Sequence, residues 1–151
     1  MKKEIQQDFI EGLRTAKGDR LVDIIGIWGF RIQQTALRKD YGLVADYTSK
    51  VVPELVRIFT NPDTDVALRG TIATTIISFG LVLDDLVYKG EYKLNNVPVF
   101  QKLYREVIGA IDVCLEYPIA VSGKKAILES LPRFTETENT RKLKEKITDR
   151  L

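Results

Sequence analysis

The chain has 151 residues, of which 44% are hydrophobic and 29% are charged, and its net charge is +2. These values are ordinary for one globular domain, and they give no strong reason to expect binding to nucleic acid or to an anionic membrane. The chain contains no histidine and one cysteine. The usual zinc sites, an intramolecular disulfide and any catalytic triad that needs histidine are therefore excluded.

The first two helices are predicted at Lys3–Lys17 and Arg20–Arg38, because apolar residues recur there at helical spacing. Gly18 suits the left-handed residue that often ends a helix. Gly26 and Gly29 lie inside the second helix, where each glycine costs about 1 kcal/mol relative to alanine. Such glycines favour the close packing of a neighbouring helix or, alternatively, the approach of a ligand to the backbone.

The next helix is predicted to begin near Leu43 and to bend before Pro53, which suits the first turn of a helix because that position needs no backbone N–H. The turn at Asn61–Asp63 ends this helix, because the residue before a proline avoids the helical region. Asp63 or the following threonine can cap the next helix, Thr64–Gly80. That helix is apolar on two sides, which is typical of a helix packed between neighbours.

The segment Val51–Gly80 resembles a repeat of the HEAT and armadillo superfamily, and the resemblance lies in Pro53, Leu55, Phe59, Pro62, Asp63, Val66 and Ala73. It covers one repeat. The resemblance implies an α-solenoid with a concave binding surface, and it implies no catalytic residue. In that family a valine–arginine pair usually opens the second helix, whereas here Val66 is followed by Ala67 and the nearest arginine is Arg69.

The rest of the chain is also predicted to be helical, and no strand pattern is convincing. Lys89–Val97 is polar and rich in turn residues, so it is the best internal boundary in the single domain that we expect over residues 1–151. Thr135 and Glu138 have the spacing of a capping box before the last helix. The remaining helices are predicted at Pro98–Tyr117, Ala120–Leu131 and Glu136–Leu151.

These patterns together predict the all-α fold class with six to seven helices. The helices are arranged either as stacked hairpins, as in a HEAT-like solenoid, or as an irregular helical bundle.

Two sets of residues are candidates for a protein-binding surface. The last helix has a thin apolar seam that buries little by itself, so we expect this helix to be peripheral and to dock a partner. The helix Thr64–Gly80 carries hydroxyls at three- and four-residue spacing, which either bond to carbonyls of their own helix or line an uncharged groove. The candidates are Leu143, Ile147 and Leu151 in the seam, and Thr71, Thr74, Thr75 and Ser78 in the hydroxyl strip.

Basic residues are candidates for contact with an anion or with the phosphates of nucleic acid. Lys124 and Lys125 follow the start of a helix, where backbone N–H groups favour an anion. Arg141, Lys142 and Lys144 lie on the last helix among several acidic residues. That mixture is more typical of a solvated helix face than of a phosphate-binding stripe.

Carboxylates are the remaining candidates for chemistry in a chain without histidine. Asp84 and Asp85 follow a long apolar run, and we expect them to mark its exit into solvent rather than a site for a divalent metal. Asp112 and Glu116 lie one helical turn apart, so either an exposed face or a cationic partner is expected. Cys114, between them, is predicted to be a buried small hydrophobe.

The sequence therefore favours a non-enzymatic protein–protein interaction module that docks a partner protein, or a second copy, on a helical groove. We expect no metal and no cofactor. The uncharged run Gly70–Leu83 has fourteen residues, too few to span a bilayer, so no membrane insertion is expected. No signal peptide is visible, and a cytoplasmic location follows by default.

Three alternatives stay open at this point. One is a helical scaffold that binds the backbone of nucleic acid. Another is a histidine-free enzyme that uses carboxylates and a divalent metal. A ligand-binding helical regulator, acting through Gly26, Gly29 and the hydroxyl strip, is the third.

Overall fold

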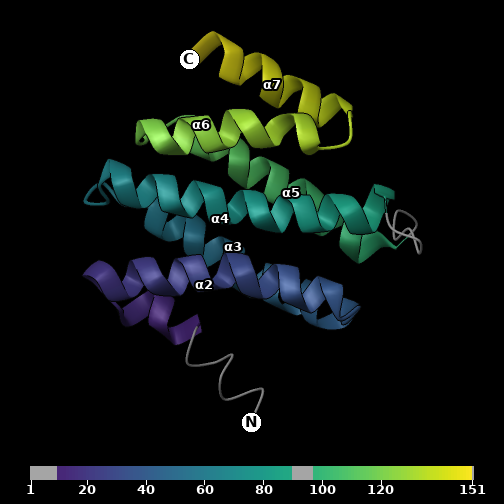
Figure 1. Ribbon diagram of the computed structural model, residues 1–151, viewed down its shortest axis with the longest axis horizontal. Coiled ribbons are helices and arrows are strands. Elements are labelled where there is room, and N and C mark those ends of the chain that lie inside the picture. Colours follow the sequence, from purple (N-terminus) through teal and green to yellow (C-terminus); the bar gives the residue numbers. More distant parts are fainter. Residues whose placement is uncertain (1–9, 90–96, 151) are drawn as a thin grey trace.

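Figure 1 shows the computed structural model, which describes residues 10–89 and 97–150, without the side chains of residues 148–150. Counting residues 10–15 as one, this part of the chain forms seven α-helices and no strand, so the predicted all-α class is confirmed. The longer helices are α2 (Gly18–Leu37), α3 (Tyr41–Thr60), α4 (Val66–Asp84), α5 (Pro98–Cys114), α6 (Val121–Ser130) and α7 (Glu138–Arg150). A π-helical turn, η1 (Asp85–Lys89), follows α4, and a 3₁₀ turn, η2 (Leu131–Arg133), follows α6.

The helices are arranged in two layers. α2, α4 and α6 lie side by side in one layer, and α3 and α5 lie behind them (Figure 1). α4 is at the centre and packs against α2, α5 and α6. Most of its surface is apolar because it has neighbours on several sides. The start of the helix predicted at Lys3–Lys17 and most of the predicted boundary at Lys89–Val97 lie outside the described residues.

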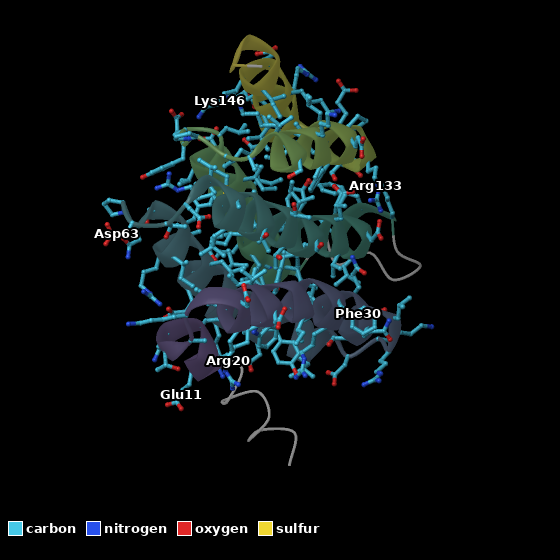
Figure 2. The ribbon with its side chains drawn as sticks, turned by 60° about the vertical axis from the view of Figure 1, so that its left-hand side comes forward. Glu11, Arg20, Phe30, Asp63, Arg133 and Lys146 are labelled. Atoms are coloured by element: carbon cyan, nitrogen blue, oxygen red, sulfur yellow. The ribbon has the colours of Figure 1, made fainter. Side chains whose placement is uncertain are left out.

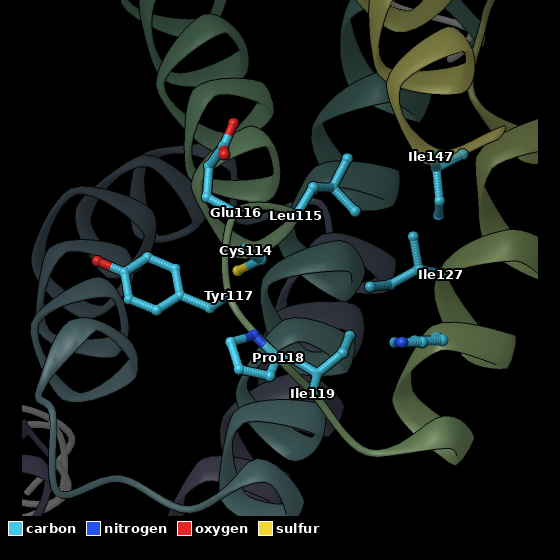
Figure 3. Close-up of a pocket in the computed structure, with 9 residues that line it drawn as sticks. Cys114, Leu115, Glu116, Tyr117, Pro118, Ile119, Ile127 and Ile147 are labelled. Carbon is cyan, nitrogen blue, oxygen red and sulfur yellow. The ribbon is translucent and has the colours of Figure 1, made fainter. Parts of the chain in front are cut away.

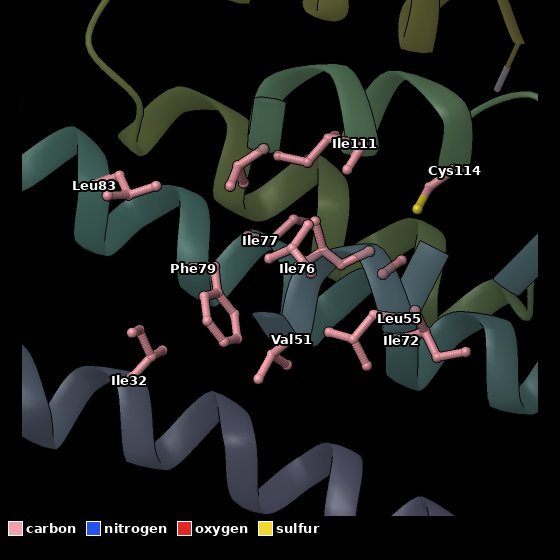
Figure 4. Packing of buried hydrophobic residues seen from close by; sticks show 14 of the residues in the cluster. Ile32, Val51, Leu55, Ile72, Ile76, Ile77, Phe79, Leu83, Ile111 and Cys114 are labelled. Atoms are coloured by element: carbon pink, nitrogen blue, oxygen red, sulfur yellow. The ribbon is translucent and has the colours of Figure 1, made fainter. Parts of the chain in front are cut away.

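The hydrophobic core lies between the two layers. Ile32 of α2, Val51 and Leu55 of α3, Phe79 of α4 and Ile111 of α5 meet there (Figure 4). Each of these side chains is at most 1% exposed. Burial of one such side chain contributes about 1.5–3 kcal/mol, so contacts between distant helices dominate the stability of this fold.

The two helices predicted on either side of the turn at Asn61–Asp63 are present as α3 and α4, but their boundaries differ from those expected. α3 continues as one helix through Pro53. This proline is exposed, so water can satisfy the carbonyl that lacks a backbone donor. The cap of α4 is Asp65 rather than Asp63 or Thr64, because the Asp65 carboxylate accepts a hydrogen bond from the Leu68 N–H at 2.7 Å.

Arg69 joins the start of α4 to the end of α3. Its Nε donates to the Phe59 carbonyl at 2.9 Å, and its Nη2 donates to the Asn61 carbonyl at 3.1 Å. The guanidinium also lies 5.0 Å from the centroid of the Tyr117 ring. Because the last carbonyls of a helix lack backbone donors, Arg69 supplies a donor to the Phe59 carbonyl. It adds a second donor to the Asn61 carbonyl, which also accepts from the Thr64 N–H at 3.0 Å.

α4 and α6 cross closely at Gly70 and Gly123. A Cβ atom on Gly123 would lie only 2.8 Å from the Gly70 Cα atom. A Cβ atom on Gly26 would meet nothing within 4 Å, so the favoured explanation of Gly26 as a helix-packing position is wrong. Gly29 does face a neighbouring helix, because a Cβ atom on it would lie 3.6 Å from the Ser78 hydroxyl oxygen, an ordinary contact distance.

Asp84 fastens the end of α4 to two other elements. Its carboxylate is fully buried and accepts hydrogen bonds from the Tyr104 hydroxyl at 2.9 Å and from the Thr135 N–H and hydroxyl at 3.0 and 2.9 Å. Lys89 Nζ lies 3.4 Å away. Burial and the Asp84 carboxylate raise the pKa of Tyr104, which keeps its hydroxyl protonated as a donor. Asp84 therefore does not mark an exit into solvent, whereas its neighbour Asp85 is exposed.

The predicted capping box of Thr135 and Glu138 is also wrong, because Thr135 bonds to Asp84 instead. α7 begins after Thr137, whose hydroxyl accepts from the Thr140 N–H at 3.2 Å. The Thr140 hydroxyl accepts from the Thr137 N–H at 2.8 Å. The reciprocal bonding expected of a capping box is thus made by a pair of threonines.

Asp84→Ala is expected to lower the free energy of unfolding by about 3 kcal/mol, because it leaves the Tyr104 hydroxyl and the Thr135 N–H without their acceptor. Asp85→Ala is the matched control, and an exposed substitution of this kind changes stability by about 0.5 kcal/mol or less. Urea unfolding followed by circular dichroism measures both variants. Equal losses for the two substitutions would contradict the role assigned to Asp84.

Candidate functional site

A groove with a volume of about 440 Å³ runs over the layer formed by α2, α4 and α6. None of the residues that line it is charged, and most are glycine, alanine, serine or threonine. These small side chains leave the surface of the layer hollow. The lining includes Gly26, Phe30 and Gln33 of α2, Thr71, Thr74 and Ser78 of α4, and Ser122 of α6.

The predicted hydroxyl strip lies in this groove. Thr71, Thr74 and Ser78 each donate to the carbonyl four residues earlier, at 3.3, 2.9 and 3.3 Å. Thr75 is only 4% exposed, and it also lies 3.2 Å from the Ile25 carbonyl of α2. A hydroxyl has one proton and two lone pairs. The strip therefore bonds to its own helix and still offers oxygen lone pairs to a molecule in the groove.

Phe30, labelled in Figure 2, is one of the residues that line the groove, and it is 64% exposed. It also borders a second cavity of about 660 Å³ between α2 and α3, which Arg31, Arg38 and Tyr47 help to line. Ile27, in the same cavity, is 39% exposed. Aromatic and arginine side chains are enriched in protein interfaces, so this part of α2 has the composition of a binding surface.

Phe30 is not among the binding residues that the sequence pattern indicated. The usable signal was its position on α2, outside the stripe of Leu21, Ile25, Trp28 and Ile32 that the structure buries. A large aromatic residue away from the buried stripe of an amphipathic helix is a candidate for a partner contact. Helical spacing alone does not show whether another helix covers such a residue.

The apolar seam of the last helix is covered by the chain itself. Leu143 and Ile147 are 2% and 3% exposed, which corrects the expectation of an open docking seam. Leu151 lies outside the described residues. α7 packs on α5, and Leu143 and Ile147 belong to the hydrophobic core.

Lys146 of α7 is the cationic partner expected for Asp112 and Glu116, so that prediction is confirmed. Its Nζ lies 2.9 Å from Asp112 Oδ1, and it also pairs with Glu116. Burial alone would lower the pKa of Lys146, but the hydrogen bonds to Glu116 and Asp112 outweigh burial and raise it. The lysine therefore stays charged and ties α7 to α5.

The basic candidates are divided between α6 and α7. Arg141 and Lys142 are exposed and pair with Glu136 and Glu138, at 3.7 and 3.5 Å. This mixed charge differs from the continuous positive stripe that follows a phosphate backbone. Lys144 also belongs to α7, Lys125 is exposed on α6, and Lys124 lines a separate cavity.

Two of the carboxylates considered for catalysis are bonded to other side chains of the protein. Asp84 is bonded to Tyr104 and Thr135, and Asp112 is bonded to Lys146. Within residues 10–89 and 97–150, no group of three histidine, cysteine, aspartate or glutamate residues is placed to hold a metal ion.

One stretch, Val66–Lys89, is long and apolar enough to cross a membrane by length and composition, with a mean hydropathy of 1.8. In this fold 61% of its most apolar window is buried. The central helix of a soluble protein passes the same test, so this property is weak evidence for a membrane span.

Comparisons with protein-family models, with curated proteins and with solved structures found no significant match to this chain. The protein is therefore described by its fold class alone. It is an all-α protein in which three neighbouring helices form a groove lined by uncharged residues. The resemblance of Val51–Gly80 to a HEAT or armadillo repeat and the cytoplasmic location stay predictions.

Leu143→Ala is expected to lower the free energy of unfolding by about 2–4 kcal/mol, because the shorter side chain leaves a cavity between α7 and the rest of the core. Lys142→Ala, on the exposed side of the same helix, is the control and is expected to change stability by about 0.5 kcal/mol or less. Thermal and urea unfolding measure the difference. If Leu143→Ala leaves the free energy of unfolding unchanged, α7 is peripheral, as the sequence alone suggested.

Proposed function

We propose that the protein is a protein–protein interaction module, an adaptor or a subunit of an assembly, that docks a partner on the groove of α2, α4 and α6. The observation that carries this proposal is Phe30, a large aromatic side chain that is 64% exposed beside a groove without charged residues. Burial of an aromatic side chain gives a large hydrophobic gain, and interfaces concentrate such residues at their centres.

The chemistry of the groove supports a polypeptide partner. The side chains that line the groove are small, so a partner helix or strand can approach the backbone of α2 and α4 closely. The hydroxyl oxygens of Thr71, Thr74 and Ser78 are acceptors that suit amide or other N–H donors. A partner segment with one apolar face and a few uncharged donors complements this surface.

Nucleic-acid binding and carboxylate catalysis have less support. Binding to phosphates requires positive charge, and the lining of the groove contains none. The exposed basic residues Arg141 and Lys142 are paired with acids. A carboxylate that acts as an acid or base needs access to a substrate, whereas Asp84 is fully buried.

Phe30→Ser and Thr74→Arg are expected to reduce the capture of a specific partner from native extract at least ~tenfold relative to the unchanged chain. The first substitution removes the aromatic anchor, and the second places a bulky charge in the groove. Affinity capture with quantitative mass spectrometry measures the loss. If the partner is a second copy of the chain, sedimentation velocity of the unchanged chain and of both variants measures the loss of self-association.

Val99→Ser on α5 and Ser49→Arg on α3 are matched controls, because they make the same kinds of change at exposed positions outside the groove. Both controls are expected to capture the partner as well as the unchanged chain. Circular dichroism establishes that every variant is folded. Equal capture by the groove variants and the controls would overturn the proposal.

A further inference from the structure

The exposed side of α2 carries a second apolar stripe, separate from the one that packs in the core. Ile27, Phe30 and Leu37 are 39%, 64% and 74% exposed. Together with Gln34 they are spaced alternately by three and four residues, which is the a and d spacing of a coiled-coil helix. The stripe covers about three helical turns, or roughly 15 Å, so it is long enough to contact a partner helix.

An open cavity of about 660 Å³ lies on one flank of this stripe, between α2 and α3. Ile27 and Phe30 line it together with Leu43, which is half-buried. The cavity at the end of α5 in Figure 3 is different, because its Ile127 and Ile147 are at most 3% exposed and offer a ligand almost no surface. An apolar side chain of a partner can therefore contact exposed carbon atoms in the cavity between α2 and α3.

Two arginines lie along the same flank of the stripe. Arg31 and Arg38 both line the cavity, and they are seven residues apart. They therefore lie two turns apart on one face of α2, separated by about 10 Å along the helix axis. In the coiled-coil spacing of the stripe both occupy the e position, where a charged residue pairs with the opposite charge on a partner helix.

Both guanidinium groups can reach a partner. Arg31 lies 5.5 Å from the centroid of the Trp28 ring, which is fully buried and packs edge-on against Tyr47. A guanidinium has five N–H donors in a rigid plane, so Arg31 can bind a carboxylate in addition to its contacts within the chain. Arg38 is exposed, and its side chain makes no hydrogen bond or ion pair with the described part of the chain.

The charge on the two flanks of the stripe differs. Asp40 is the acidic residue of the cavity lining, and its carboxylate caps α3 by accepting from the Leu43 N–H at 3.3 Å. The positive end of α3 offsets that negative charge. Lys39, beside Asp40, is exposed. The opposite flank is the groove, whose lining contains no charged residue. The stripe is therefore bordered by positive charge on the cavity side and by uncharged residues on the groove side.

We propose that the partner segment is an amphipathic helix that lies along Ile27, Phe30 and Leu37, with carboxylates on the flank that faces Arg31 and Arg38. This inference rests on the proposed function and specifies the chemistry of the partner. The apolar face of the partner helix covers the stripe and places a side chain in the cavity. Its other flank, facing the groove, is uncharged.

A second copy of the chain does not supply the required negative charge. In an antiparallel pair of such stripes the e positions face each other, so Arg31 and Arg38 would meet arginines. In a parallel pair the e positions face the g positions, which here are Gly26 and Gln33. Nucleic acid would supply charge, but its phosphates and bases do not match a stripe that ends in an aliphatic side chain, Leu37.

The test uses three synthetic helical peptides of about sixteen residues that share one leucine stripe and carry glutamate, glutamine or lysine on one flank. Binding to the full chain is followed by NMR of methyl groups. The methyls of Ile27, Leu37 and Leu43 are expected to shift saturably with the glutamate peptide, with a Kd on the order of 10–100 µM. The buried Ile25 and Ile111 are expected to stay unchanged. The glutamine peptide is expected to bind about threefold more weakly, and the lysine peptide at least ~tenfold more weakly.

The double variant Arg31→Glu/Arg38→Glu is expected to reverse this order, so that the lysine peptide binds at least ~threefold more tightly than the glutamate peptide. A structural role of the arginines would instead weaken all three peptides alike. Arg20→Glu/Lys125→Glu is the matched control, since it changes the net charge equally at exposed positions outside the stripe and the cavity. It is expected to keep the original order. If the double variant does not fold, Arg38→Glu alone is expected to bring the affinities for the glutamate and lysine peptides within about threefold of each other.

The outcomes separate this inference from the proposed function. Equal affinity for the three peptides, lost for all of them in Thr74→Arg, would overturn the acidic partner and keep the groove as a docking surface. The predicted order of affinities, unaffected by Thr74→Arg, would support the acidic partner and remove the groove from the site. The absence of a saturable shift with any peptide up to about 1 mM would overturn the inference. Tighter binding of a single-stranded oligonucleotide at the same methyls would overturn it in favour of nucleic acid.

Discussion

A helix that is apolar around most of its surface is stable only when other helices cover it, and α4 imposes this constraint here. α2, α5 and α6 pack against it, so its burial brings together segments far apart in the sequence. A buried charged residue near each end of α4 also bonds to neighbouring segments and so fixes their positions relative to α4. Arg69 bonds to the end of α3, and Asp84 bonds to Tyr104 of α5 and to Thr135 before α7. One helix thereby positions most of the others.

The groove is a consequence of the same arrangement. α4 needs close neighbours on both sides, and the Gly70–Gly123 crossing allows α6 to approach it without an intervening side chain. The outer surface of the layer is therefore built from small residues, and hydroxyls that bond to their own helix cover it without charge. Among these small residues Phe30 is large, and no other part of the described chain covers it. We propose that a partner protein buries it.

Helical spacing was sufficient to predict the all-α class, because apolar periodicity is a local property of each helix. The errors arose where a distant residue decides the outcome. Thr135 has the local pattern of a cap but bonds to Asp84, and Asp84 has the pattern of an exposed end but is buried. The hydroxyl strip could be predicted from spacing. The burial of Leu143 and the exposure of Phe30 could not, because each depends on which neighbouring helix is present or missing.

We propose that the layer of α2, α4 and α6 is the surface that recognises a partner. Hydroxyl-radical footprinting of the bound and free chain tests this claim most directly, since it reports the solvent exposure of individual side chains. The account predicts that Phe30 loses most of its reactivity when the partner binds, while Val99 on α5, 47% exposed in the free chain, stays as reactive as before. Undiminished reactivity of Phe30 together with protection of Val99 would contradict it.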